Sequence, residues 1–330
     1  MSPLLFRKLP LRSLSAFSTL LSYRASPTMP LKPVASPSSP VHWILDWDGT
    51  ITSHDTLDAL VNISATTKPN FPTLKHWNRV TQAYLDDYTT TLAELAPGGA
   101  LPKTVEEEKT LLESLQVVEQ RSLDRVSESG IFQGLTKEQL SQGANTAITS
   151  QQIQIRTGYV DFFNHIQSHK TNFHILSVNW SRHFILACIS AAGAELRLDS
   201  IYANELQGIQ EGTSSNGHIS PDGNTKIVSS GDKLQCLEHL RSANLTSGKS
   251  SQIVYIGDSW TDIECLLAAD LGICIRDDPM GSSQKRLAEA LERLGIQCLP
   301  LKDWEKSDKW NVVWARDFDE INEWAQSTGR

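Results

Sequence analysis

The chain has 330 residues, of which 39% are hydrophobic and 21% charged, as is typical of a globular protein with a proper core. Its formal net charge of −8 argues against non-specific nucleic-acid binding and against adhesion to an anionic membrane. No apolar run has the length of a membrane-spanning helix, and the five cysteines show no CxxC spacing, so we expect no integral membrane segment and mostly buried free thiols.

The start of the chain differs in composition from the rest. Residues 1–45 contain no Asp or Glu but five basic residues, with many Ser, Leu and Pro. This pattern is typical of a mitochondrial transit peptide, although a disordered tail, or an extension before a start at Met29, also fits it. Residues 27–40 have the Pro/Ser-rich composition of a linker. We therefore expect residues 1–40 to be a transit peptide or disordered linker, and the protein to be mitochondrial or cytoplasmic.

The apolar run that begins at Val41 leads directly into the sequence DWDGT, residues 46–50. Positions two apart on a strand face the same side, so Asp46 can point its carboxylate into a crevice. The backbone carbonyl of Asp48 can turn toward the same place, and such oxygen ligands suit Mg²⁺. Trp47 alternates away from the carboxylates and is expected in the core. The alternative interpretation is an ordinary Asp-Gly turn after a strand.

Residues 53–154 follow without strand patterns. Helical periodicity, interrupted by Gly and Pro, predicts about four helices in this region. The predicted helices cover residues 57–63, 76–95, 105–126 and 137–148. Because they do not alternate with strands, we expect an inserted helical module.

From residue 155 onward, predicted strands and helices alternate. The expected strands are 173–178, 199–203, 252–257, 271–275, 297–301 and 312–315. The expected helices are 157–170, 182–192, 233–241, 262–269, 284–294 and 319–326. A hairpin is expected over 208–224. This alternation indicates an α/β fold, a doubly wound parallel sheet built from residues 41–52 and 155–330. Such sheets bind ligands at the carboxyl ends of their strands.

Polar residues follow three of the predicted strands. They are Asp46 and Asp48 after the first, Ser177 after the second, and Asp258 in the sequence GDSWTD after the third. Lys233 opens a helix between the last two. Because strand ends of a parallel sheet converge on one crevice, we expect these side chains to lie together.

These residue types fit phosphoryl transfer. A carboxylate nucleophile splits hydrolysis into two steps through an aspartyl-phosphate. A second carboxyl group protonates the leaving oxygen and then activates water. A hydroxyl and a lysine hold the non-bridging oxygens, while Mg²⁺ reduces the repulsion between nucleophile and phosphate.

Taken in order, DWDGT, Ser177, Lys233 and GDSWTD resemble the four motifs of the haloacid dehalogenase superfamily over roughly residues 41–300. The resemblance implies a Rossmann-like core and a Mg²⁺-dependent hydrolase acting on a small phosphorylated metabolite. It implies that Asp46 is the nucleophile and Asp48 the acid/base. It further implies that Ser177 and Lys233 bind phosphate.

The same resemblance implies a metal site formed by Asp46, Asp48, Asp258 and Asp262. In it, Asp258 is a direct ligand and Asp262 an outer or water-mediated partner. Lys226 is an alternative for the lysine role, but the helix around Lys233 and its distance before GDSWTD fit the motif better.

The helical insertion, residues 53–154, resembles the cap of the phosphoserine phosphatase branch, which closes over the site. In that branch an acidic residue after the first motif contacts the substrate, which makes Asp55 a candidate; otherwise it caps the first helix of the insertion. The second motif, SVNWS, lacks the paired glycines common in phosphoserine phosphatases. Residues 255–275 instead resemble the phosphatase portion of plant thiamine-salvage proteins. Phosphoserine-like, thiamine monophosphate and sugar phosphate substrates therefore all stay open.

Two tryptophans, Trp180 and Trp260, follow polar residues at predicted loops near the site. Their rings would favour a flat or cationic substrate, unless they pack under the cap. We expect Asn179 and Trp180 to join Asp55 as substrate contacts, and His54 to be a solvated loop residue.

Three other functions remain open on the sequence. They are dehalogenation, phosphoryl transfer by a phosphomutase, and a non-catalytic Mg²⁺-binding regulatory module. Asp48 argues against dehalogenation, because the expulsion of halide needs no proton donor.

Overall fold

The computed structural model describes residues 40–169, 171–220, 226–246, 251–306 and 311–330. The predicted transit peptide or linker, residues 1–40, lies outside this part of the chain apart from Pro40. The end of the predicted hairpin, residues 221–224, also lies outside it.

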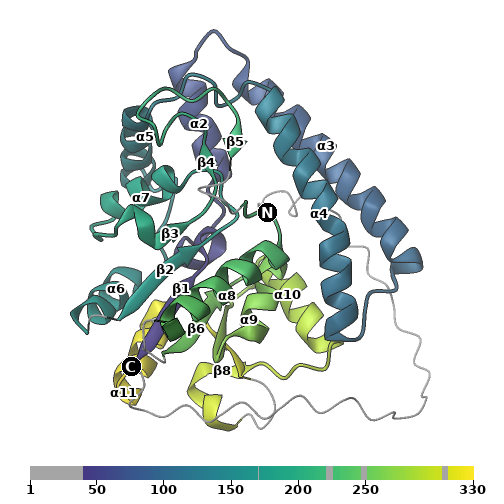
Figure 1. Cartoon of the computed structure of the whole chain (residues 1–330), viewed down its shortest axis with the longest axis vertical. Helices are drawn as coiled ribbons and strands as arrows, with labels where there is room; N and C mark the ends of the chain where they lie inside the picture. Colours follow the sequence, from purple (N-terminus) through teal and green to yellow (C-terminus); the bar gives the residue numbers. More distant parts are fainter. Residues whose placement is uncertain (1–39, 170, 221–225, 247–250, 307–310) are drawn as a thin grey trace.

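A seven-stranded parallel sheet forms the centre of the molecule, in the order β3-β2-β1-β6-β7-β9-β8 (Figure 1). Its strands are β1 (Val41–Leu45), β2 (Asn172–Leu176), β3 (Ile201–Tyr202), β6 (Gln252–Gly257), β7 (Leu271–Ile275), β8 (Leu299–Pro300) and β9 (Val312–Ala315). In the register of the central strands, Ile44 of β1 lies between His174 of β2 and Tyr255 of β6. Continuous apolar strands such as β1 and β7 are buried throughout, as a sheet covered on both faces requires.

Alternate residues of β1 point to opposite faces of the sheet. Trp43 packs edge-to-face on Phe162, with ring centroids 5.0 Å apart, while Ile44 belongs to the cluster on the other face. The first face is covered by α6 (Tyr159–Ser168), α7 (Arg182–Ala191) and α11 (Phe318–Thr328), and the second by α8 (Ser230–Thr246), α9 (Ile263–Ala268) and α10 (Ser282–Arg293). The predicted doubly wound parallel sheet is confirmed.

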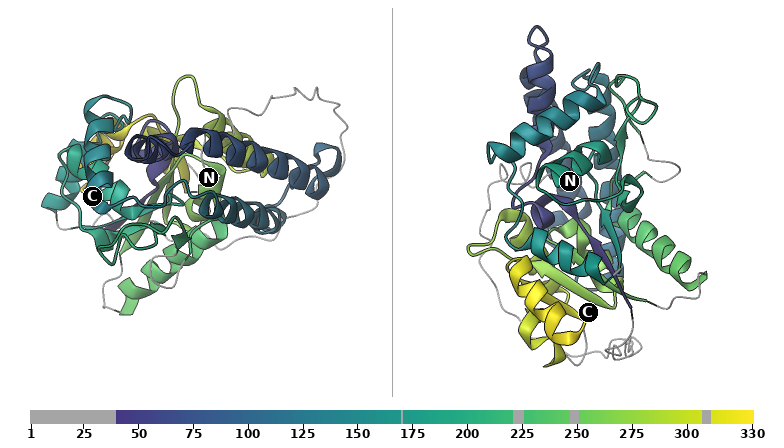
Figure 2. Two further views of the ribbon diagram at one scale, coloured as in Figure 1. Left: turned by 90° about the horizontal axis from the view of Figure 1, so that it is seen from above. Right: turned by 90° about the vertical axis from the view of Figure 1, so that its left-hand side faces the viewer.

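Four helices occupy the region between β1 and β2. They are α2 (Leu57–Thr67), α3 (Thr73–Leu95), α4 (Val105–Glu128) and α5 (Lys137–Thr149). Helices α3 and α4 form a long pair along one side of the molecule, whereas α2 packs on α5, which packs on α7 (Figures 1 and 2). Helix α5 begins with a capping box: the Thr136 side chain accepts from the backbone N–H of Gln139, and the Gln139 side chain accepts from that of Thr136. These two hydrogen bonds explain why the helix begins there.

Short elements account for the differences from the predicted pattern. Only two residues of the expected strand 199–203 pair with β2, because a 3₁₀ turn, Leu198–Ser200, precedes them. The expected strand 297–301 is likewise cut short by a 3₁₀ turn over Leu301–Lys306. The hairpin predicted over 208–224 starts earlier than expected: β4 (Glu205–Leu206), which pairs antiparallel with β5 (Ile219–Ser220), lies before that range.

Several smaller predictions also have an outcome in the described residues. No helix among them has the length and apolarity needed to cross a bilayer. The cysteines are free thiols, four buried and Cys298 half-buried, as expected. Trp47 is fully buried in the core, and its indole N–H donates to Thr56 Oγ1 at 3.1 Å, which confirms that it points into the fold.

Candidate active site

A tight turn at the end of β1 brings two strand ends together. Gly49 has φ of +78°, and a Cβ atom there would clash with the carboxylate of Asp258 at the end of β6. Glycine is therefore required by both the backbone conformation and the close approach. Arg156, where the chain re-enters the core, donates to the carbonyl oxygens of Gly49 at 2.7 Å and Thr50 at 2.8 Å. The turn is thus held from both sides.

Lys233 forms the centre of a buried ionic group below this turn. Its Nζ atom donates to Asp46 Oδ1 at 2.8 Å and to Asp262 Oδ1 at 2.7 Å, and its side chain is fully buried. Asp262 also accepts hydrogen bonds from Tyr255 and Ser259. Although burial opposes its ionisation, the Lys233 charge and these hydrogen bonds hold the pKa of Asp262 below its ordinary value.

Three carboxylates gather around this lysine. Asp46, Asp258 and Asp262 each offer one oxygen, and these oxygens lie within 4.8 Å of one another. Burial, followed by the charge of Asp262, raises the pKa of Asp46 to about 7. Burial and the charges of Asp262 and Asp46 raise the pKa of Asp258 well above its ordinary value. When ionised, these three carboxylates would carry more negative charge than Lys233 alone neutralises, which fits a divalent cation bound by oxygen ligands, such as Mg²⁺. We call Asp46, Lys233, Asp258 and Asp262 the floor.

Asp48 lies beside the floor but points elsewhere. Its Oδ1 atom accepts from the backbone N–H and the hydroxyl of Thr56, both at 2.7 Å, and its Oδ2 atom accepts from Asn179 Nδ2 at 2.9 Å. Burial raises the pKa of Asp48, although these hydrogen bonds oppose the shift. Its carboxylate is not part of the three-oxygen cluster, so a metal contact through its backbone carbonyl stays a prediction.

The remaining residues of the predicted phosphate site lie on different elements. Ser177 is fully buried just after β2, and its Oγ atom accepts from the N–H of Asn179 at 3.1 Å. Lys226 instead donates to Gln120 of α4. Of the two lysines weighed from the sequence, Lys233 is therefore the one that contacts the carboxylates.

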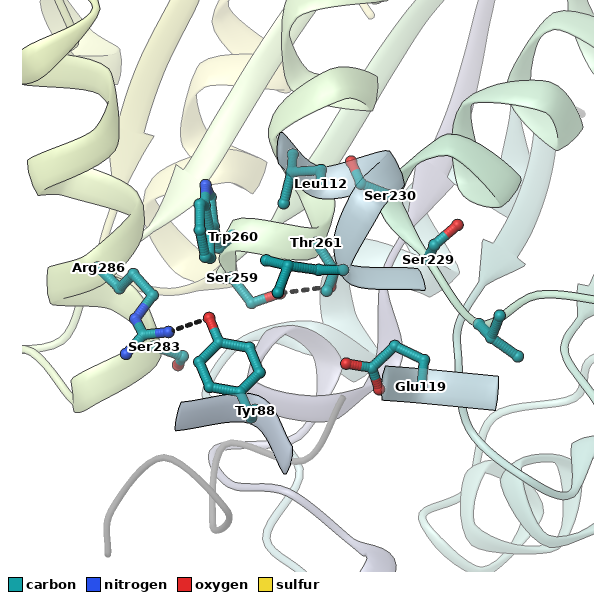
Figure 3. Close-up of a pocket in the computed structure, with 12 residues that line it drawn as sticks. Tyr88, Leu112, Glu119, Ser229, Ser230, Ser259, Trp260, Thr261, Ser283 and Arg286 are labelled. Atoms are coloured by element: carbon teal, nitrogen blue, oxygen red, sulfur yellow. Dashed lines mark hydrogen bonds between the residues drawn. The ribbon is translucent and has the colours of Figure 1, made fainter. Parts of the chain in front are cut away.

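Two pockets adjoin the floor, and α4 borders both. The inner pocket, with a volume of about 440 Å³, is lined by Asp48, Asp55, Tyr84, Glu119, Asn179 and Trp180, among others. The lateral pocket, of about 540 Å³, is lined by residues that include Tyr88, Glu119, Ser259, Trp260, Ser283 and Arg286 (Figure 3).

The predicted substrate contacts all line the inner pocket, yet each also has a structural partner. Asp55 Oδ1 accepts from the N–H of Leu57 at 2.8 Å, as a residue capping α2 would. Trp180 packs edge-to-face against Trp77 and Phe132. Each of these residues can therefore serve both the fold and the pocket.

The other aromatic and histidine candidates lie apart from the inner pocket. Trp260 lines the lateral pocket, and its indole N–H donates to Glu108 Oε1 at 2.6 Å. His54 is exposed, as expected for a loop residue.

Several contributors to the site carry no sequence signal. Thr56 holds Asp48, Arg156 holds the turn, and Ser283 donates to Asp258 Oδ2 at 2.9 Å. None of them belongs to a recognisable motif. Glu119 is one of several glutamates on α4, and only the docking of that helix shows which one faces the pockets.

Comparison with known proteins gives relatives but no match to a protein-family model. The chain is 30% identical over 244 residues to a CTO1 family protein of Schizosaccharomyces pombe, which covers 72% of this chain and 82% of that protein. It is 28% identical over 229 residues to the bifunctional TH2 protein, mitochondrial, of Arabidopsis thaliana. That match covers 68% of this chain but only 34% of the plant protein.

Solved structures share the fold at low sequence identity. A functionally unknown protein of Anaerococcus prevotii has a TM-score of 0.50 and 14% identity, covering 86% of this chain and 88% of that one. A substrate-bound phosphoserine phosphatase has a TM-score of 0.46 and 15% identity, covering 87% of this chain and 98% of that one. These likenesses concern the fold.

Proposed function

The chain belongs to the CTO1 family and has a haloacid dehalogenase-type fold, and from this premise we propose that it is a Mg²⁺-dependent phosphatase. It hydrolyses a small phosphomonoester through an aspartyl-phosphate intermediate. The observation that carries the proposal is the convergence of Asp46, Lys233, Asp258 and Asp262 on one buried floor beside Asp48. A nucleophile, a cation, a metal site and an acid/base are thus within one crevice.

In this reaction Asp46 attacks phosphorus, and the bond to the leaving oxygen breaks. Asp48 gives its proton to that oxygen, a task suited to a carboxyl group whose pKa is raised by burial. Asp48 then takes a proton from the water that attacks the phosphorus of the aspartyl-phosphate, which releases phosphate and restores Asp46.

The other residues bind and orient the phosphoryl group. Lys233 and Ser177 hold its non-bridging oxygens, and the hydrogen bond and charge of Lys233 also hold Asp46 in place and oppose the rise of its pKa. Asp46 and Asp258 would hold Mg²⁺ directly, with Asp262 as an outer partner and a carbonyl ligand from Asp48. When bound, Mg²⁺ neutralises charge on the carboxylates and the phosphate.

We assign residues 41–52 and 155–330 to the core and residues 53–154 to a helical cap. Support comes from α3 and α4, which contribute Tyr84, Tyr88 and Glu119 to the pockets. The cap excludes bulky phosphoproteins and surrounds a small substrate.

Phosphoserine-like, thiamine monophosphate and sugar phosphate substrates are the classes to compare. The plant relative named mitochondrial supports a mitochondrial site of action, with the cytoplasm as the alternative. The chain spans about a third of that bifunctional relative, so the relative's whole activity is not transferred here.

Phosphate release by the purified full chain tests the proposal. The panel is thiamine monophosphate, phosphoserine, a sugar phosphate and an aryl phosphate, each assayed with Mg²⁺ and with EDTA. We expect Mg²⁺-dependent release that favours one ester. If the folded protein binds Mg²⁺ but releases phosphate from none of these esters, a phosphomutase or a non-catalytic regulatory module would be favoured instead.

A further inference from the structure

The two pockets beside the floor differ in charge. Three carboxylates, those of Asp48, Asp55 and Glu119, line the inner pocket. Among the described residues that line it there is no Lys, Arg or His. The lateral pocket shares Glu119 but also contains Arg286. The inner pocket is therefore the more acidic of the two.

Asp48 decides which pocket receives the leaving group. On the proposed function, Asp48 protonates the leaving oxygen, so the organic part of the substrate must extend from a point beside it. Asp48 lines the inner pocket and not the lateral one. The leaving alcohol consequently faces the acidic pocket.

Glu119 is the carboxylate of this pocket that comes from the middle of the long helix α4. Its Oε1 atom accepts a hydrogen bond from the hydroxyl of the buried Tyr84 at 3.0 Å. Its side chain lines the lateral pocket, as Figure 3 shows, and also the inner pocket. Tyr84 is neutral, and burial raises the pKa of Glu119 to about 7. The nearby cation, Arg286, donates to Tyr88 and lies over the rings of Tyr88 and Trp260 at 5.4 and 5.6 Å.

Asp48 and Asp55 have other tasks. Asp48 accepts three hydrogen bonds from Thr56 and Asn179, and Asp55 accepts one from the first turn of α2. Trp180 and Tyr84 line the same pocket as these two residues and Glu119. A carboxylate facing aromatic walls is the arrangement that recognises an organic cation.

We propose that Glu119 is a specificity-determining residue, which selects leaving alcohols that carry a positively charged nitrogen and no carboxylate. This inference rests on the proposed function. A neutral sugar would leave the charge of ionised Glu119 uncompensated in the inner pocket. The carboxylate of phosphoserine would face Asp55 and Glu119, and the described residues that line the pocket include no arginine or lysine to receive it.

A pair of isosteric esters tests the proposal on the unaltered chain. Phosphocholine carries a quaternary ammonium, and in its neutral isostere a carbon atom replaces the nitrogen. We expect kcat/KM for phosphocholine to exceed that of the isostere by about tenfold or more, because a tenfold ratio needs only about 1.4 kcal/mol of differential binding. Equal values for the two esters would overturn the proposal.

Variants then assign the effect to one residue. Glu119→Gln keeps the volume and removes the charge, so the preference for phosphocholine should fall to less than about twofold, mainly through KM. Tyr84→Phe, which removes only the donor that orients Glu119, should reduce the preference partly. Glu113→Gln, at an exposed position of the same helix, is the matched control and should leave it unchanged.

The failures are distinguishable. If Glu119→Gln lowers kcat/KM equally for both esters while the unfolding temperature is unchanged, the specificity role of Glu119 is wrong, but the proposed phosphatase activity is not contradicted. If the unaltered chain hydrolyses neither these esters nor aryl phosphate with Mg²⁺, the proposed function itself is wrong, and this inference with it.

Discussion

The floor and the α3–α4 pair form two sides of one crevice but are built differently. The floor lies at the ends of paired strands and at the start of α8, and its charges are joined by short hydrogen bonds through Lys233. The helix pair contributes the side chains of Glu119, Tyr84 and Tyr88 to the pockets, and Glu119 is hydrogen-bonded to Tyr84. It contacts the core through hydrogen bonds such as that from Trp260 to Glu108.

This difference indicates a division of tasks. Backbone pairing places the reacting groups of the floor, where small displacements would cost catalysis. The helix pair instead contributes side chains that line the pockets, such as Tyr84 and Glu119. Chemistry should therefore depend on the floor together with Asp48 and Ser177, and selectivity on the helix pair.

The largest expected effect is on the floor. Asp46→Asn should lower kcat by about 10³-fold or more, because it removes the nucleophile while keeping its volume. Thermal unfolding should change little. A variant that keeps more than a tenth of the original rate would contradict the assignment of Asp46.

Loss of the buried cation should damage both rate and stability. Lys233→Met leaves Asp46 and Asp262 buried without their partner, so the free energy of unfolding should fall by about 3–5 kcal/mol. Denaturant titration measures this change. Lys226→Met is the control, since Lys226 contacts only Gln120 among the hydrogen bonds described, and should change stability by less than about 0.5 kcal/mol.

Removal of Mg²⁺ from the floor should also lower the free energy of unfolding. Mg²⁺ at about 100 times its dissociation constant should stabilise the chain by about 2.7 kcal/mol, because it binds the folded carboxylates and not the unfolded chain. Calorimetry with Mg²⁺ and with EDTA gives the shift. The shift should disappear in Asp258→Asn, and its persistence there would place the ion elsewhere.

A change in the pocket wall should alter selectivity without altering chemistry. Trp180→Ala should raise KM by about tenfold for aromatic or cationic esters, and less for phosphoserine, because it removes a ring that faces the inner pocket. Steady-state kinetics on matched esters measures both. Equal increases for both kinds of ester would leave Trp180 as a packing residue.

The smallest expected effect concerns the sheet beneath the floor. Burial lowers the pKa of His42 to about 3 and that of His174 to about 4, and their ring nitrogens lie 2.6 Å apart. Because both values are below the ordinary 6.5, the stability they contribute is present above about pH 6.5 and is lost as pH falls toward 4.

His42→Val should reduce the loss of unfolding free energy between pH 7 and pH 5 by on the order of 1 kcal/mol. Denaturation curves at the two pH values measure it. An unchanged slope would show that acid sensitivity arises elsewhere, for example in the helix pair.

The same division explains what could be predicted from the sequence. The central strands and the floor were predictable, because apolar runs identify β1, β6 and β7, and the motif residues follow those strands directly. Lys233 could be chosen over Lys226 only through the helix predicted around it and its distance before GDSWTD; that helix, α8, begins at Ser230.

The pocket wall was not predictable in the same way. Helical periodicity placed α3 and α4 closely, but it does not show how the two helices dock on the core. The roles of Glu119, Thr56 and Arg156 depend on contacts between residues distant in sequence. Likewise, β3 and β8 are too short for an apolar pattern to define their ends.

The most direct test of the account is to trap the phosphoryl group on the floor. The full chain is mixed with its best ester and Mg²⁺, quenched in acid, digested and examined by mass spectrometry. We predict a phosphorylated peptide modified at Asp46, with greater accumulation in Asp48→Asn if a good leaving group is used, because the second step then lacks its base. Rapid phosphate release with no modified Asp46 in either protein would contradict the covalent mechanism.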